Sequence, residues 1–132
     1  MALRDPVDKN MLRMEARRFA ARCEGQVSLI ERADTLREVS RLATLIMVPF
    51  SLVEDDTARD GLRLVQTRAE DRARELIHEQ LQNFARAEEN QRDKLKRTMH
   101  DAWTNLTGPL GHLRAWAQNK LLAAEQQENG AP

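Results

Sequence analysis

The sequence is poor in cysteine, glycine, proline and aromatic residues, which form disulfides, make turns and fill the core of a small protein. It has one cysteine, five glycines, four prolines and no tyrosine among 132 residues. The lone Cys23 cannot form an internal disulfide, which argues against a secreted, disulfide-stapled scaffold. Aromatic side chains are limited to three phenylalanines and two tryptophans. We therefore expect a single domain, 1–132, with a thin core of Leu, Ile, Met and Ala.

Net charge and long apolar runs are missing as well. The 21 basic residues balance the 21 acidic residues, so no bulk charge draws the chain to nucleic acid or to an anionic membrane. The apolar run from Leu45 to Phe50 is far too short to span a bilayer, and the first residues lack the apolar core of a signal peptide. We expect a soluble, cytoplasmic protein with no membrane partner.

The stretch 56–106 dominates what is present. It has no proline, a single glycine, and many strong helix formers such as Arg, Glu, Gln, Leu and Ala. A straight helix of this length would extend about 75 Å, whereas a compact chain of this size has a radius of gyration of about 14 Å. The stretch must therefore break or protrude. The polar run Glu88–Asp93 is where we expect a hinge or an exposed span, and the sequence leaves open whether it is helical.

Two helices are expected before this stretch. Asp5 and Pro6 form a good helix start, so a first helix should run to about Gly25. A second helical pattern covers residues 26–48, but the capping box from Thr35 to Glu38 offers a later start. Both alternatives fit the sequence.

The helical patterns are separated by local breaks. Pro49 interrupts the second helix, and Ser51–Glu54 forms another capping box. A second break is expected at Gly108-Pro109, followed by a last helix and a frayed tail, 125–132. The start of the long segment should attract acidic side chains, which are present at Glu54, Asp55, Asp56 and Asp60. The sequence thus predicts an all-α bundle of four to five helices around one long central helical segment, about 56–106.

No complete catalytic or metal-binding constellation stands out in the sequence. The candidates are Cys23, His78, His100 and His112. Glu75 and His78 have the spacing that di-iron bundles use, but such sites need a second pair of this kind, which the sequence lacks. Cys23 falls on the apolar face of the first helix, where packing is expected. We expect no catalytic residue, no metal and no cofactor.

Protein partners are expected instead, including a second copy of the chain. An apolar seam on a protruding helix would otherwise meet water, which predicts a homodimer. Large apolar and aromatic side chains are the usual anchors of such interfaces. The candidate interface residues are Leu62, Leu76, Phe84, Trp103 and Trp116. The alternative for the two tryptophans is a place in the core, which the sequence favours for Trp103.

The first predicted helix also carries candidate anion-binding residues. These are Arg13, Arg17, Arg18 and Arg22. Residues 1–25 are net basic and residues 51–90 are net acidic, so the arginines could instead face the acidic helix within one subunit or between two. Acidic residues interrupt the basic patch, and nucleic-acid binding is therefore possible but not favoured.

His100 and Asp101, followed by Pro109 and Leu110, resemble the phospho-acceptor box of sensor histidine kinases. The resemblance implies that His100 accepts phosphate and that Asp101 acts as its base. Here Pro109 lies farther from the histidine than in such boxes, the antiparallel second helix would have to follow Leu122, and no glycine-rich nucleotide-binding box is present.

Taken together, these patterns predict a non-catalytic α-helical interaction or assembly module, acting as a small subunit or adaptor of a larger complex. Two alternatives stay open. One is a helical subunit of a nucleoprotein complex that contacts phosphates, and the other is a histidine-kinase-like dimerisation or phosphotransfer fragment that uses His100.

Overall fold

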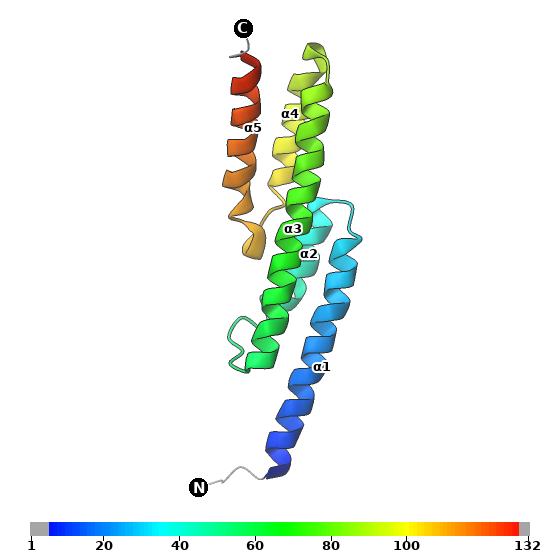
Figure 1. The fold of residues 1–132 in the computed structure, drawn as a ribbon, viewed down its shortest axis with the longest axis vertical. Coiled ribbons are helices and arrows are strands. Elements are labelled where there is room, and N and C mark those ends of the chain that lie inside the picture. The colour runs from blue at the N-terminus through cyan, green and yellow to red at the C-terminus, as the bar shows by residue number, and fades with distance from the viewer. Residues whose placement is uncertain (1–5, 130–132) are drawn as a thin grey trace.

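A computed structural model describes residues 6–129 and shows an all-α fold (Figure 1). Within this range the chain forms five α-helices and one 3-10 turn, with no β-strand. The elements are α1 (Pro6–Glu31), α2 (Leu36–Met47), α3 (Asp56–Arg86), α4 (Glu89–Trp103), η1 (Gly108–Leu110) and α5 (Leu113–Asn129). The predicted all-α bundle is confirmed.

Helix α3, with 31 residues, is the longest of the described helices and is shared by two groups of helices (Figure 1). The N-terminal bundle consists of α1, α2 and residues 56–72 of α3. The C-terminal bundle consists of residues 73–86 of α3 with α4 and α5, and η1 lies between the two bundles against α2. Helices α1 and α3 run in the same direction, and the first turns of α1 extend beyond the start of α3 (Figure 1).

The long central segment, 56–106, was expected either to break or to protrude, and in the structure it breaks. Helix α3 ends at Arg86, because Ala87 and Glu88 adopt extended backbone with ψ near 150°. The break therefore falls at the start of the polar run, and the rest of that run is the first turn of α4. Helix α4 folds back along α3 (Figure 1), which covers Phe84. Burying that ring supplies a reason to turn where the sequence has neither glycine nor proline.

The first two helices correct one prediction and select between two alternatives. Helix α1 continues through Gly25 to Glu31, so the expected end near Gly25 is wrong. Packing of Cys23, Val27 and Ile30 on the same face outweighs the roughly 1 kcal/mol helix penalty of glycine. Helix α2 begins at the later start, where the Thr35 hydroxyl accepts a hydrogen bond from the Glu38 amide at 3.2 Å.

The long helix starts at Asp56, two residues after the end of the second capping-box pattern. Ser51–Glu54 is not a helix start, since Ser51 and Val53 donate backbone hydrogen bonds in successive turns. Asp55 caps α3 instead, and its carboxylate accepts a hydrogen bond from the Ala58 amide at 3.0 Å. The acidic cluster therefore lies at the N-terminal end of the long helix, as expected from the helix dipole.

The predicted break at Gly108-Pro109 is also present, as η1. Gly108 has a φ of 51°, which is the left-handed region that glycine enters without strain. After this break α5 continues to Asn129, so the part of the expected frayed tail that the structure describes is helical. The remaining residues, 130–132, lie outside the described range.

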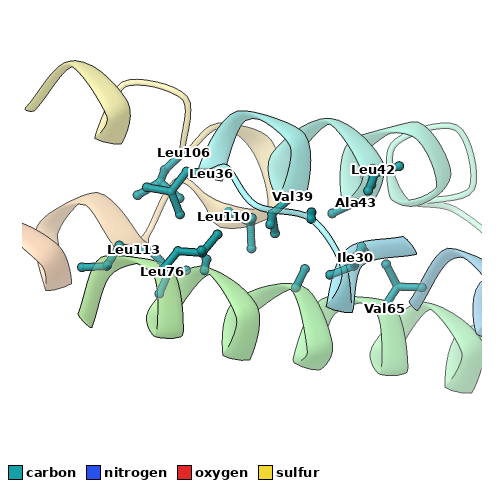
Figure 2. Close-up of a cluster of buried hydrophobic side chains, with 14 of the residues drawn as sticks. Ile30, Leu36, Val39, Leu42, Ala43, Val65, Leu76, Leu106, Leu110 and Leu113 are labelled. Carbon is teal, nitrogen blue, oxygen red and sulfur yellow. The ribbon is translucent and has the colours of Figure 1, made fainter. Parts of the chain in front are cut away.

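The core runs through both bundles. Within the N-terminal bundle, Gly61 of α3 lies so close to α1 that a Cβ atom placed there would be 2.9 Å from the Cys23 sulfur. Figure 2 shows the centre of the core, where α2, α3, η1 and α5 meet around buried leucines such as Leu36, Leu76 and Leu110. The buried Ser40 hydroxyl ties α2 to the segment before η1, accepting from the Thr107 amide at 3.4 Å.

Candidate interaction surface

An apolar groove lies at the end of the N-terminal bundle, between α1, the α2–α3 loop and the first turn of α3. Its volume is about 480 Å³. The groove is lined by Leu12, Glu15, Ala16, Arg18, Phe19, Arg22, Phe50, Val53, Asp55 and Ala58. Most of this lining is apolar, and charged side chains stand at the rim.

Two phenylalanine rings form the floor of the apolar groove. The centroids of Phe19 and Phe50 are 4.5 Å apart with their planes tilted by 51°, a geometry that aromatic pairs favour. Phe19 is buried, Phe50 is half-buried, and the Arg22 guanidinium stands 5.7 Å from the centre of the Phe50 ring. The floor is therefore fixed while one ring remains partly accessible.

The α2–α3 loop holds its side of the groove in a defined shape. Val53 donates a backbone hydrogen bond to Phe50 at 3.2 Å, which closes a tight turn. Arg59 of α3 donates from Nε to the Val53 carbonyl at 3.1 Å. These bonds hold Phe50 and Val53 against α1, while Leu52 at the tip of the loop is 92% exposed.

The free end of α1 leaves one wall of the groove uncovered. Leu12 continues the stripe of Ala16, Phe19 and Cys23 that packs in the core, yet Leu12 is 48% exposed. Figure 1 shows the reason, because α3 begins above this part of α1. Met11 and Met14, in the same turns, are also about half exposed.

The four candidate anion-binding arginines do not form one patch. Residues four apart lie about one turn apart on a helix, whereas neighbours lie about 100° apart around it. Arg13 and Arg17 therefore share one side of α1, and Arg18 and Arg22 share another. Only the second pair lines the apolar groove.

Three of the five candidate interface residues belong to the core. Leu76, Phe84 and Trp103 are buried within the chain, so they are not available to a partner in this structure. The indole of Trp103 donates to Gln80 Oε1 at 2.9 Å. In this structure these three side chains therefore contribute to the core of the chain, which is the alternative that was open for Trp103.

The other two candidate interface residues, Leu62 and Trp116, are half-buried. Leu62 lines a second groove, between the α2–α3 loop and the first turns of α3. Two cations stand over Trp116, because the Arg74 guanidinium carbon and the Lys120 Nζ each lie 5.8 Å from the centroid of a Trp116 ring. Part of each side chain remains accessible to solvent.

His100 lies in the last turn of α4 and is half-buried. Its ring packs edge-on against Trp103, with centroids 5.5 Å apart, while Asp101 is exposed. The helix that runs antiparallel to α4 is α5, and it begins at Leu113 instead of following Leu122 as expected. Pro109 and Leu110 form the turn between these two helices, with Leu110 buried.

A polar cluster at the junction of α3 and α5 had no signal in the sequence. Glu70 accepts hydrogen bonds from Gln66 at 2.7 Å and from Arg74 at 3.3 Å, and His112 Nε2 is 3.3 Å from its carboxylate. Burial tends to raise the pKa of Glu70, but the hydrogen bonds from Gln66 and His112 and the charges of His112 and Arg74 outweigh it. The pKa of Glu70 therefore lies below its usual value.

The remaining titratable candidates have structural partners or are buried. Glu75 accepts from Arg72 at 2.9 Å, and His78 contacts Gln82. Cys23 is fully buried, and this burial raises the pKa of its thiol. Among the side chains that the structure describes, residues 10–127, no group of three or more His, Cys, Asp or Glu is arranged to hold a metal ion.

Comparisons with known proteins give no match for this chain among protein families, curated proteins or solved structures. In the part of the chain that the structure describes, every helix is too short or too polar to cross a lipid bilayer.

Proposed function

We propose that this chain is a non-catalytic interaction module that binds a helix of a protein partner in the apolar groove. It would act in the cytoplasm as a small subunit or adaptor of a larger assembly. The single observation that carries this proposal is the groove itself, with an aromatic floor and a leucine, Leu12, left about half exposed beside it. Uncovered apolar grooves with polar rims mark interaction sites.

The dimensions of the apolar groove suit a helix. Along α1 its lining extends from Leu12 to Arg22, which corresponds to about 15 Å at 1.5 Å per residue. An amphipathic helix places apolar anchors at intervals of three or four residues, so two or three anchors fit over this length. Burying one leucine-sized anchor contributes roughly 1.5–3 kcal/mol.

The charged rim of the groove supports a protein partner over a small apolar molecule. Glu15, Arg18 and Arg22 stand on the α1 side and Asp55 stands on the α3 side. Charges at the rim of an interface fix orientation and exclude wrong partners more than they add affinity. A partner helix would therefore be recognised by its apolar stripe and by the order of its flanking charges.

The experiment that tests this function compares two leucines of α1. Leu12 and Leu29 are 48% and 45% exposed on the same helix, but only Leu12 lines the apolar groove. We expect proteins captured from cells by the native chain to be lost with Leu12→Gln and retained with Leu29→Gln, because glutamine keeps the helix and removes the apolar anchor. Equal capture by both variants would contradict the proposal.

A further inference from the structure

We infer that the helix that fills the apolar groove is α1 of a second copy of this chain, packed antiparallel so that Glu15 of each copy pairs with Arg18 of the other. This inference rests on the proposed function, because it names the occupant of the same groove. It requires the groove face of α1 to be complementary to itself.

The order of the residues along that face makes it complementary to itself. Met11, Glu15, Arg18 and Arg22 follow one another at intervals of four, three and four residues, so they form one stripe along α1. The spacing is the same read from either end. In a two-fold symmetric contact, residue i of one copy meets residue j of the other, and j meets i. An antiparallel pair centred between Glu15 and Arg18 therefore makes the Glu15–Arg18 contact twice.

Neither member of this pair has an ion-pair partner among the side chains that the structure describes. Glu15 and Arg18 are exposed and form no ion pair in the part of the chain that the structure describes. By contrast, charges on α2 and α3 pair locally, as Arg41 does with Glu38 at 2.7 Å and Arg72 with Glu75 at 2.9 Å. The opposite charges on α1 are thus free to meet a second copy.

The same antiparallel alignment of the two α1 helices also covers the exposed apolar residues near the start of α1. Met11 of one copy would lie beside Arg22 of the other, and within one chain that guanidinium stands over the Phe50 ring. The half-exposed Met11 and Leu12 would then close over the open side of the Phe19 and Phe50 floor. Each copy supplies the turns of α1 that extend beyond α3 and receives the same turns from its partner.

The predicted contact is short. It spans residues 11–22 of each α1, about 18 Å of helix, with the α2–α3 loops at its two ends. An interface this short buries an area near the lower end of the range for specific complexes. We therefore expect a dimer that dissociates in the micromolar range. The two ion pairs are exposed, and added salt should weaken the dimer.

Sedimentation velocity over a range of protein concentrations tests the inference with a charge-reversal series. Glu15→Arg alone and Arg18→Glu alone each put like charges together twice, and each should raise the dimer dissociation constant about tenfold or more. The double variant Glu15→Arg/Arg18→Glu restores opposite charges and should recover an affinity close to that of the native chain. Arg13→Glu, on another side of α1, is the matched control and should dimerise normally. Circular dichroism checks that every variant keeps its helices.

The outcomes separate this inference from the proposed function. A native chain that stays monomeric at high micromolar concentration overturns the inference, as does a dimer unaffected by the single reversals or not recovered by the double one. If the chain is monomeric but Leu12→Gln still loses its captured proteins, the groove binds another protein and the proposed function stands. If neither dimerisation nor capture depends on the groove, both are wrong.

Discussion

The two ends of α3 are packed in different ways. In the N-terminal bundle, small residues such as Ala58, Gly61 and Ala69 let α1 approach closely along many turns. In the C-terminal bundle, α4 buries only Met99 and Trp103, and large rings at Phe84 and Trp103 fill the space between helices. The first arrangement spreads its stabilisation over many contacts, whereas the second depends on a few large side chains.

The two bundles also differ in what they leave exposed. Among the described residues, every exposed large hydrophobic side chain except Leu122 belongs to α1, α2 or the α2–α3 loop. The more closely packed bundle is therefore the one with uncovered apolar surface. This combination suits a rigid surface that presents a groove, with the C-terminal bundle as its support.

The largest expected effect comes from removing the ring that fills the C-terminal bundle. Trp103→Ala should lower the free energy of unfolding by about 3–5 kcal/mol, since it opens a large cavity and removes the hydrogen bond to Gln80. Chemical denaturation would measure the change. Trp116→Ala, at a half-buried tryptophan, is the control and should lower it by only about 1 kcal/mol. Equal effects would mean that the C-terminal bundle does not depend on Trp103.

The N-terminal bundle should instead be sensitive to added volume. Gly61→Ala places a methyl group 2.9 Å from the Cys23 sulfur and should destabilise the protein by about 1–3 kcal/mol through overpacking. Gly25→Ala is the matched control, because nothing lies within 4 Å of its Cβ position, and it should stabilise the protein by about 0.5–1 kcal/mol. Cys23→Ala should relieve part of the Gly61→Ala effect. A Gly61→Ala variant as stable as the native chain would show that α1 and α3 are not closely packed.

Helix caps distinguish the two bundles at a smaller scale. Thr35→Ala removes the cap of α2 and should cost about 1 kcal/mol. Helix α4 lacks a side-chain cap at Glu88, although the backbone there is extended. Glu88→Ser should therefore stabilise the protein by about 0.5–1 kcal/mol. Thermal melts of both variants would measure these changes, and destabilisation by Glu88→Ser would contradict the account of this break.

The smallest expected effect is the pH dependence of the contact between α3 and α5. Because the pKa of Glu70 is lowered in the folded chain, its contribution to stability is present above the unfolded pKa of about 4.3 and is lost as pH falls through the folded pKa. Glu70→Gln should remove this component, which we expect to be below about 1 kcal/mol. Urea denaturation at pH 6 and at pH 3, conditions chosen on either side of roughly that unfolded pKa, would detect it. If the native chain and the variant lose equal stability on acidification, Glu70 is not the source of this pH dependence.

Much of the fold could be predicted because local backbone chemistry determined it. Pro49, Gly108 and the Thr35 cap each act within a few residues of their position, and the breaks occur there. The predicted end near Gly25 was wrong because packing carries α1 on to Glu31. The capping-box pattern at Ser51–Glu54 does not start a helix because Asp55 caps α3. The polar run from Glu88 indicated a hinge, but no glycine or proline marks its exact place, and the turn falls at Ala87 and Glu88, where α4 can fold back over Phe84.

The candidate surface was harder to predict for the same reason. Arg18 and Arg22 were identified as charged residues, but their place beside the groove depends on where the α2–α3 loop sets Phe50. Trp103 could belong to the core or to an interface, and only the folding back of α4 decides that it is buried. Glu70 and His112 lie 42 residues apart, and no spacing rule connects them.

Hydrogen–deuterium exchange at low and high protein concentration tests most directly whether two copies of the chain meet through the N-terminal end. On raising the concentration, we expect slower exchange in the first turns of α1 and in the α2–α3 loop, with α4 and α5 unchanged. Slower exchange in α4 or α5, or no change in any part of the chain, would contradict this account.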